Sequence, residues 1–198
     1  MNPYLDDNEL YLFNTGKSAY AYRALGCHRV AMPEGYEAFR FAVWAPDARA
    51  VSVVGSFNGW NPRADPMTPC GTTGVWQAHV GIARHGNLYK YAIMTKKGEL
   101  IYKADPYAFF SEPRPETASV VWDPIPFKWT DDAHMAARRR PARPPREAPM
   151  SIYEVHLGSW REGRDYAQLA AELVDYVADL GYTHVEFMPV CEYPLDDS

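Results

Sequence analysis

Apolar and polar side chains alternate along residues 35–125. In the segment FRFAVWAP, large side chains occupy every second position at Phe39, Phe41 and Val43, the period of a strand with one buried face. Short apolar runs recur at a spacing of roughly 8–12 residues, separated by Gly, Pro and Asn. The further runs are VSVVGSF from Val51, VWQAHV at Val75–Val80, NLYKYAIM at Asn87–Met94 and ASVVWD at Ala118–Asp123. This pattern predicts an immunoglobulin-like sandwich of two antiparallel sheets.

The pattern changes in residues 150–198. MSIYEVHLGSW begins as a near-continuous strand, and THVEFMPV at Thr183–Val190 is a second strand. Between them, Asp165 to Leu180 has apolar residues at the i, i+3, i+4 and i+7 spacing of an amphipathic helix, with Asp165 as its cap. Two strands joined by such a crossover predict a parallel βαβ unit. A closed (β/α)₈ barrel takes ~250 residues, so we expect here the start of a barrel, truncated after its first βαβ unit.

Two further segments connect these regions. Residues 1–34 are expected to form an N-terminal arm, in which Asp6 and Asp7 can cap a short helix through Phe13. Residues 126–149 are expected to form a connector that ends in the sequence RRRPARPPREAP, Arg138–Pro149. A basic run can indicate nucleic-acid binding, but its prolines forbid a helix and favour an extended chain. We therefore interpret it as a stiff spacer between domains.

Composition narrows the class of protein. The chain has 198 residues, 47% of them hydrophobic, and a formal net charge of -5, which does not favour nucleic acid as a partner. Its three cysteines are far apart and not in a metal spacing, so reduced thiols in a cytoplasmic protein are expected. The N-terminus does not resemble a signal peptide, and no apolar run reaches the ~18 residues that span a membrane. Since no phosphate loop, metal cluster or nucleophile–His–Asp arrangement is found, no cofactor is expected.

The stretch GSFNGW, Gly55–Trp60, combines a turn signal with a tryptophan. Asn58-Gly59 is the strongest short-range signal for a hairpin turn. An indole beside such a turn can pack under the loop or be offered to a ligand. The aromatic content, 14 Tyr, 8 Phe and 6 Trp, leaves the same choice open for the whole chain. It fits a β-rich core, and it also fits stacking on sugar rings.

Three segments near the C-terminus resemble a known family. YEVHLGSW, GYTHVEFMPV and CEYPLDDS are similar to the start of the catalytic barrel of bacterial 1,4-α-glucan (glycogen) branching enzymes. These enzymes belong to the α-amylase superfamily, glycoside hydrolase family thirteen. Upstream, FAVWAPDARAVSVVGSFNGWNP, LYKYAI and KADPYAFFSEPRPETASVVW resemble the carbohydrate-binding module of family forty-eight type that precedes that barrel. YLFNTGKSAYAYRALGCH resembles the arm ahead of the module.

The resemblance implies a glycosyltransferase-type activity in glycogen biosynthesis. Branching enzymes cleave an α-1,4-glucan chain, hold it as a covalent glycosyl-enzyme and transfer it to a 6-hydroxyl, with two carboxylates acting as in retaining glycosidases. In the family these carboxylates lie at the ends of the fourth and fifth barrel strands, so no catalytic residue is expected among these residues and the fragment alone is expected to be inactive. A stand-alone glucan-binding module without catalysis is the alternative.

The resemblance also implies a glucan-binding site. In similar modules, a Trp after the GSFN turn, a Lys in the "YK" strand and a second Trp before Asp-Pro contact glucose. The matching residues here are Trp60, Lys90 and Tyr102, so the second platform is a tyrosine. An α-glucan is therefore the expected partner, while packing of Trp60 within a loop or between domains stays open as the other interpretation.

Polar residues recur on both strands expected after residue 150. Glu154 and His156 are two residues apart and share one strand face, as do His184 and Glu186. We expect both pairs to face the barrel interior, away from the helix, and to belong to a structural polar network.

Overall fold

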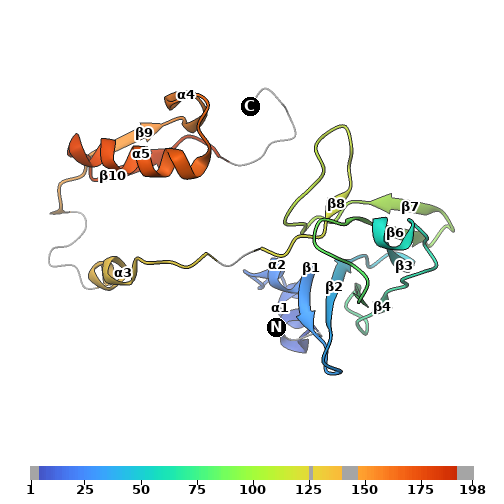
Figure 1. Cartoon of the computed structure of the whole chain (residues 1–198). Helices are drawn as coiled ribbons and strands as arrows, with labels where there is room; N and C mark the ends of the chain where they lie inside the picture. Colours follow the sequence, from blue (N-terminus) through green and yellow to red (C-terminus); the bar gives the residue numbers. More distant parts are fainter. Residues whose placement is uncertain (1–4, 125–126, 140–146, 191–198) are drawn as a thin grey trace. The chain divides into compact units, whose positions relative to one another are not determined.

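The computed structural model describes residues 5–124, 127–139 and 147–190. It divides into two compact units, residues 1–127 and residues 128–198, which are described separately below. Figure 1 shows the strands of the first unit and the helices and strand pair of the second.

The first unit contains two antiparallel sheets. One sheet has the strand order β1-β2-β5-β4, formed by β1 (Gly26–Ala31), β2 (Glu37–Trp44), β5 (Val75–Val80) and β4 (Thr68–Pro69). The other has the order β3-β6-β7, formed by β3 (Ala48–Gly55), β6 (Leu88–Thr95) and β7 (Leu100–Lys103), and β8 (Ser119–Val120) also pairs with β6. The predicted mainly β architecture is confirmed.

Alternating side chains of the two sheets form the main core. Phe41 from β2, Val53 from β3, and Tyr89 and Tyr91 from β6 are all fully buried in one cluster. The ring centroids of Phe41 and Tyr89 lie 5.0 Å apart in an edge-to-face arrangement, which is the preferred geometry for aromatic pairs. The abundant aromatic residues therefore contribute to the core of the first unit.

Two N-terminal helices, α1 (Asp7–Asn14) and α2 (Ala21–Ala24), belong to the same unit. Asp6 caps α1, because its side chain accepts a hydrogen bond from the Asn8 N–H at 2.7 Å. Leu10 and Leu25 pack with Ala42 and Val75 in a second cluster on the opposite side of the first sheet. Strand β2 is consequently buried on both faces along most of its length.

Strand β1 lies within residues 1–34, the stretch expected to form the N-terminal arm. It pairs with β2 from Gly26↔Ala42 to Ala31↔Glu37. His28 and Arg29 interrupt the apolar alternation of this strand, so its sequence carries no clear period of two. Its pairing with β2 therefore depends on tertiary contacts that the local pattern does not reveal.

A buried polar cluster joins β6 to the segment after β7. The carboxylate of Asp105 accepts hydrogen bonds from the hydroxyls of Tyr89 and Tyr91 at 2.7 and 3.0 Å, and from the Tyr107 N–H at 2.8 Å. The Asp105 N–H donates to the Ser119 hydroxyl at 2.9 Å. These bonds fix the chain between β7 and β8 against the core.

The second unit contains α3 (Asp132–Arg139) and a parallel strand pair. Strand β9 (Ile152–Val155) pairs in parallel with β10 (His184–Phe187), and helix α5 (Tyr166–Asp179) lies between them in the chain. Asp165 and Gln168 form a capping box at the start of α5, with bonds of 2.8 and 3.0 Å. The predicted parallel βαβ arrangement is therefore confirmed.

The strand that begins at MSIYEV is short. It ends at Val155, and residues Leu157–Trp160 form a short helix, α4. The backbone N–H groups of Ser159 and Trp160 donate to the His156 carbonyl oxygen at 3.2 and 3.0 Å, which turns the chain out of the strand. The segment therefore begins with the predicted strand, and LGSW forms the first turn of the connection to α5.

None of the helices in the described part of the chain is long and apolar enough to cross a membrane. Cys27 and Cys70 are free thiols, and burial raises the pKa of both. Cys191 lies outside the described residues.

Candidate functional site

The GSFNGW stretch closes the end of β3. Residues Ser56–Asn58 form a single 3₁₀ turn, and Gly59 and Trp60 follow with φ angles of 63° and 60°. The chain then returns beside β3, where the Val53 N–H donates to the Asp65 carbonyl oxygen at 3.0 Å. Asn58 and Gly59 therefore do not form the two-residue turn of a hairpin, because the chain reverses through a longer loop.

The side chain of Asn58 holds this loop. Its Oδ1 accepts from the Gly55 N–H at 2.9 Å, while its Nδ2 donates to the Val53 carbonyl oxygen at 3.0 Å and to Asp65 Oδ2 at 2.7 Å. An asparagine side chain used in this way satisfies backbone groups that a hairpin turn would have paired. The Asn-Gly dipeptide alone could not reveal that the Asn58 side chain would bind these backbone groups in place of a hairpin turn.

Trp60 has an uncommon backbone conformation. A non-glycine residue in the left-handed region costs of order 1 kcal/mol or more, and such residues cluster at functional sites. The Trp60 N–H donates to the Gly55 carbonyl oxygen at 3.0 Å, and the residue is 38% exposed. The loop therefore presents part of the indole at the surface instead of burying it.

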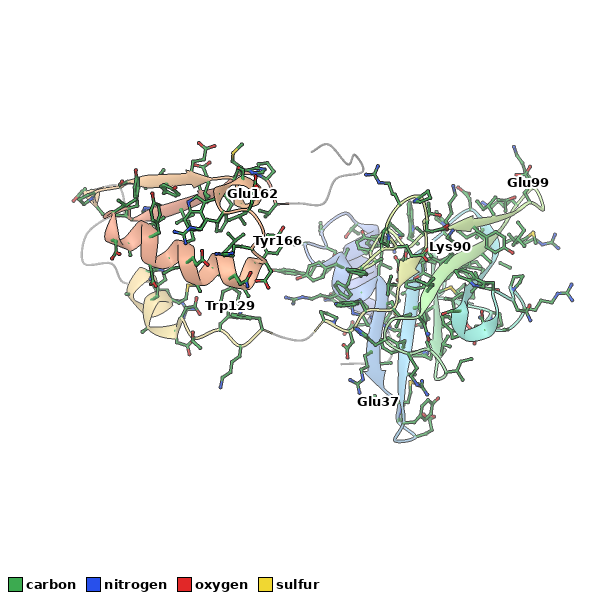
Figure 2. All side chains as sticks on the ribbon, turned by 45° about the horizontal axis from the view of Figure 1, so that its top comes forward. Glu37, Lys90, Glu99, Trp129, Glu162 and Tyr166 are labelled. Atoms are coloured by element: carbon green, nitrogen blue, oxygen red, sulfur yellow. The ribbon has the colours of Figure 1, made fainter. Side chains whose placement is uncertain are left out.

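Lys90 and Tyr102 come from the strands beside this loop (Figure 2 labels Lys90). Lys90 lies opposite Val54, and Tyr102 lies opposite Ala92, two residues further along β6. Because residues two apart share a strand face, Lys90 and Tyr102 lie on the same face of the β3-β6-β7 sheet, opposite the face that carries Tyr89 and Tyr91. Lys90 Nζ donates to the Thr117 hydroxyl at 2.8 Å, and Tyr102 is 47% exposed.

The register sets the spacing of these three residues. Gly55 lies opposite Tyr89 of β6, and Tyr102 lies opposite Ala92 of the same strand, three residues further along. The backbones of Gly55 and Tyr102 are therefore about 10 Å apart along the strands and about 10 Å apart across them. The structure places Lys90 and Tyr102 on one sheet face, and it places the backbone of Trp60 beside Gly55 at the end of β3.

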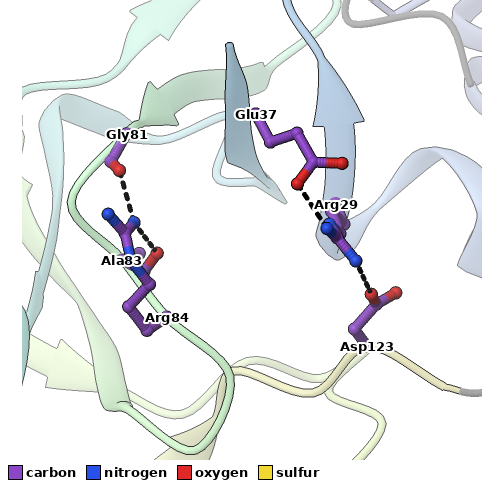
Figure 3. Close-up of polar contacts among 6 residues, drawn as sticks. All are labelled: Arg29, Glu37, Gly81, Ala83, Arg84 and Asp123. Atoms are coloured by element: carbon purple, nitrogen blue, oxygen red, sulfur yellow. Dashed lines mark hydrogen bonds and ion pairs between the residues drawn. The ribbon is translucent and has the colours of Figure 1, made fainter.

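A charged pocket of 660 Å³ lies elsewhere on the first unit, formed by residues that no sequence motif points to. Figure 3 shows Arg29 from β1 between the carboxylates of Glu37 and Asp123. Arg84, from the connection between β5 and β6, also lines this pocket. Residues up to 94 positions apart meet here, so no local motif could have pointed to the pocket.

In the second unit, the polar pair on β9 lies on the strand face away from α5, while the expected barrel interior and polar network stay predictions. Tyr153 and Val155 pack in the cluster that includes Leu173 and Val177 of α5, whereas Glu154 and His156 are exposed. Glu154 lies directly opposite Glu186 in the parallel register. Both carboxylates lie within strands, whereas barrel active sites form at the C-terminal strand ends. In the described part of the chain, no group of three His, Cys, Asp or Glu residues could hold a metal ion.

Comparison with known proteins gives consistent matches. Residues 24–108 match the family described as carbohydrate-binding module 48 (isoamylase N-terminal domain). The 1,4-alpha-glucan branching enzyme of Desulfitobacterium hafniense is 46% identical over 202 aligned residues, which cover 100% of this chain and 32% of that protein. The corresponding enzyme of Rubrobacter xylanophilus is 50% identical, with 99% of this chain and 27% of that protein covered. The chain thus spans about a third of the length of the curated relatives that it matches.

Solved structures of pullulanases are similar in fold. Pullulanase type I from Bacillus subtilis, complexed with maltose, has a TM-score of 0.59 and 26% identity, and the match covers 89% of this chain and 26% of that one. Apo pullulanase from Paenibacillus barengoltzii has a TM-score of 0.58 and 24% identity, covering 96% of this chain and 31% of that one. Both matches extend over most of the chain.

Proposed function

We propose that this chain, which matches a 1,4-alpha-glucan branching enzyme along its whole length, supplies the glucan-binding module and the beginning of the catalytic barrel of such an enzyme. The enzyme would cleave α-1,4 chains and transfer them to form α-1,6 branches in glycogen. The observation that carries this proposal is the continuous match at 46% identity across both units.

The domain organisation follows from the same proposal. Residues 1–34 supply the arm and also strand β1 of the sandwich, residues 35–125 the rest of the carbohydrate-binding sandwich, residues 126–149 the connector and residues 150–198 the start of the barrel. Its support is the parallel pairing of β9 and β10 around α5, because parallel strands with a helical crossover are the repeating unit of a (β/α)₈ barrel. Val185 and Phe187 on β10 are 37% and 52% exposed, which fits a strand that a neighbouring barrel element covers.

A stand-alone glucan-binding module is the second candidate function. The sandwich alone would suffice for it, and the match of residues 24–108 to a binding-module family favours it. A module that only binds has no use for the βαβ arrangement of the second unit. The match to branching enzymes across both units therefore favours the first candidate.

Trp60, Lys90 and Tyr102 are proposed to form the glucan-binding face. The indole of Trp60 and the phenol of Tyr102 would stack on sugar rings, and the Lys90 ammonium would donate hydrogen bonds to hydroxyls. The exposed fractions of the two rings and the shared sheet face support this proposal. Maltose in the Bacillus subtilis pullulanase structure is consistent with an α-glucan as the ligand class.

Trp60→Ala should weaken the binding of maltoheptaose. Stacking on two exposed rings without a deep pocket gives an affinity near millimolar, about 4 kcal/mol, and loss of one ring should raise Kd roughly tenfold. Isothermal titration of wild type and variant measures this. Tyr11→Ala, which removes another exposed ring from α1, is the matched control and should bind like wild type. Equal binding by wild type and Trp60→Ala would make Trp60 a packing residue.

These 198 residues alone should neither branch nor hydrolyse glucan. Glu172 and Asp175 lie on the outer helix α5, and Glu154 and Glu186 lie within strands, so none of them lies at a C-terminal strand end. Positioning of the reacting groups can supply ~7–11 kcal/mol of barrier reduction, and an incomplete barrel lacks the walls that provide it. Iodine staining of amylose and reducing-end release test this. Turnover that persists through purification would contradict the proposed division between binding and catalysis.

A further inference from the structure

The charged pocket at Arg29 has the volume of a small-molecule site. Its volume of 660 Å³ lies within the ~300–1,000 Å³ usual for ligand pockets. Strand β1 supplies Arg29, strand β2 supplies Glu37, the β5–β6 connection supplies Arg84 and His85, and the chain after β8 supplies Asp123. Phe39, Ala38 and Ala83 also line the pocket, and all three are nearly fully buried.

The charges of this pocket balance. Arg29 forms ion pairs with Glu37 and, at 3.1 Å, with Asp123. Arg84 Nη1 donates to the carbonyl oxygens of Gly81 and Ala83 at 2.5 and 2.8 Å (Figure 3). Two guanidinium groups and two carboxylates give a formal sum of zero, so the pocket offers little net attraction to an anion or a cation.

His85 adds a directed hydrogen-bond donor. Its Nδ1 accepts the Asp123 N–H at 3.2 Å, so the neutral ring carries its proton on Nε2. The centroid of the His85 ring lies 4.4 Å from that of Trp122, which stacks on Phe110 at 4.8 Å. The imidazole is thus held in place by packing on one side of the pocket.

The polar groups are arranged before any ligand binds. Among the described contacts, Arg29 engages Glu37 through Oε2 and Asp123 through Oδ2. The other oxygen of each carboxylate can accept further hydrogen bonds, because an ionised carboxylate has about four acceptor positions. Side chains already held by ion pairs lose less conformational entropy when they bind a ligand.

We propose that the pocket formed by Arg29, Glu37, Arg84, His85 and Asp123 is a second binding site for neutral glucose residues of an α-glucan, separate from the Trp60 face. This proposal rests on the proposed glucan-binding function. Paired acceptors on Glu37 and Asp123 and the donors of Arg84 and His85 match the adjacent hydroxyls of a pyranose ring. A glucan carries no charge, so the balanced charges of the pocket fit it better than an anionic ligand.

The test is a maltoheptaose titration of the full chain followed by backbone amide chemical shifts. Trp60→Ala should leave residual binding with shifts at Glu37, His85 and Asp123. Adding His85→Phe and Glu37→Gln to Trp60→Ala should raise the residual Kd at least about fivefold, because each variant removes a hydrogen-bonding or ion-pairing group. His85→Phe keeps a ring against Trp122, and Glu37→Gln keeps an acceptor, so the fold is retained. Thermal unfolding of each variant verifies this.

The salt dependence of the Kd distinguishes a neutral ligand from an anionic one. Raising sodium chloride from about 0.05 to about 0.5 M should leave the residual Kd within roughly twofold, since screening acts on charged partners. A Kd that rises steeply with salt would overturn the neutral-glucan assignment. Shifts at the Trp60 loop but none at the pocket would refute the pocket site while the proposed glucan-binding function stands. Absence of any maltoheptaose binding by wild type would contradict both the pocket site and the proposed glucan-binding function.

Discussion

Asp105→Ala should lower the free energy of unfolding of the first unit by about 3 kcal/mol. The substitution removes the acceptor for the buried hydroxyls of Tyr89 and Tyr91 and for the Tyr107 N–H. Each buried donor left without a partner costs about 1–3 kcal/mol. Tyr91 recovers part of this loss, because its hydroxyl also lies 3.4 Å from the Ala42 carbonyl oxygen.

Asp105→Asn is the matched control. Its carbonyl oxygen can still accept from the Tyr107 N–H, and its amide group can donate to a phenol oxygen after the hydroxyls rotate. We expect it to cost about 1 kcal/mol or less relative to wild type. Urea unfolding of the three proteins measures the difference. An Asp105→Ala protein as stable as Asp105→Asn would show that the hydrogen bonds contribute little.

Burial of the Asp105 carboxylate leads us to expect that the free energy of unfolding depends on pH. Burial raises the pKa of Asp105 above its ordinary value of 3.8, although the bonds from Tyr89, Tyr107 and Tyr91 act in the opposite direction. A raised pKa in the folded state means that the folded protein binds the proton more tightly than the unfolded chain. The stabilisation is therefore fully present below pH 3.8 and is lost as the pH rises through the folded-state pKa.

The measurement compares wild type with Asp105→Asn across pH, because their difference removes the contribution of the other carboxylates. The unfolding free energy of wild type minus that of the variant should fall as the pH rises above 3.8. A difference that increases with pH would mean that the hydrogen bonds outweigh burial. Burial also raises the pKa values of Tyr89 and Tyr91, so both stay protonated donors throughout.

Gly55→Ala should destabilise the first unit by about 2–4 kcal/mol and displace the Trp60 loop. A Cβ at this position would overlap the Leu88 carbonyl oxygen and would lie 2.6 Å from the Phe57 ring. The carbonyl belongs to β6 and cannot move without disturbing the sheet. The φ of Gly55 is -174°, which is extended backbone, so the expected cost comes from the lack of space.

Gly59→Ala distinguishes the cost of a left-handed backbone conformation from the cost of insufficient space. Gly59 has a φ of 63°, and a methyl group added there would meet no atom within 4 Å, so the left-handed conformation alone should cost about 1 kcal/mol. Urea midpoints and maltoheptaose affinity are measured for both variants. Gly55→Ala should lose both stability and binding at the Trp60 face. If it unfolds at the same urea concentration as Gly59→Ala, the tight contact with Leu88 does not constrain the loop.

Strong periodicity made most of the sandwich predictable. FRFAVW and VWQAHV carry enough alternating apolar residues to define β2 and β5, and the capped amphipathic pattern from Asp165 defined α5. Strand β4 has only two residues, so it carries no period that a sequence pattern could reveal. Burial of β2 on both faces, to which Leu10 of α1 and Leu25 after α2 contribute, is likewise a tertiary effect that removes the expected polar face.

The candidate site was predictable only in part. Family resemblance pointed to Trp60, Lys90 and Tyr102, and the strand register then showed that Lys90 and Tyr102 share a face. The pocket at Arg29 has no local signature, because the strand pairing of β1 with β2 and the return of the chain at Asp123 create it. Long-range ion pairs of this kind depend on topology, which side-chain spacing alone does not encode.

The central claim is that the sandwich of the first unit binds α-glucan. Amide chemical-shift mapping of the full chain with maltoheptaose tests it most directly, because it reports where the ligand binds as well as whether it does. We predict shifts confined to the first unit, including the loop at Trp60 and the strand segments at Lys90 and Tyr102. A spectrum that does not change at millimolar maltoheptaose, or shifts confined to the second unit, would contradict the claim.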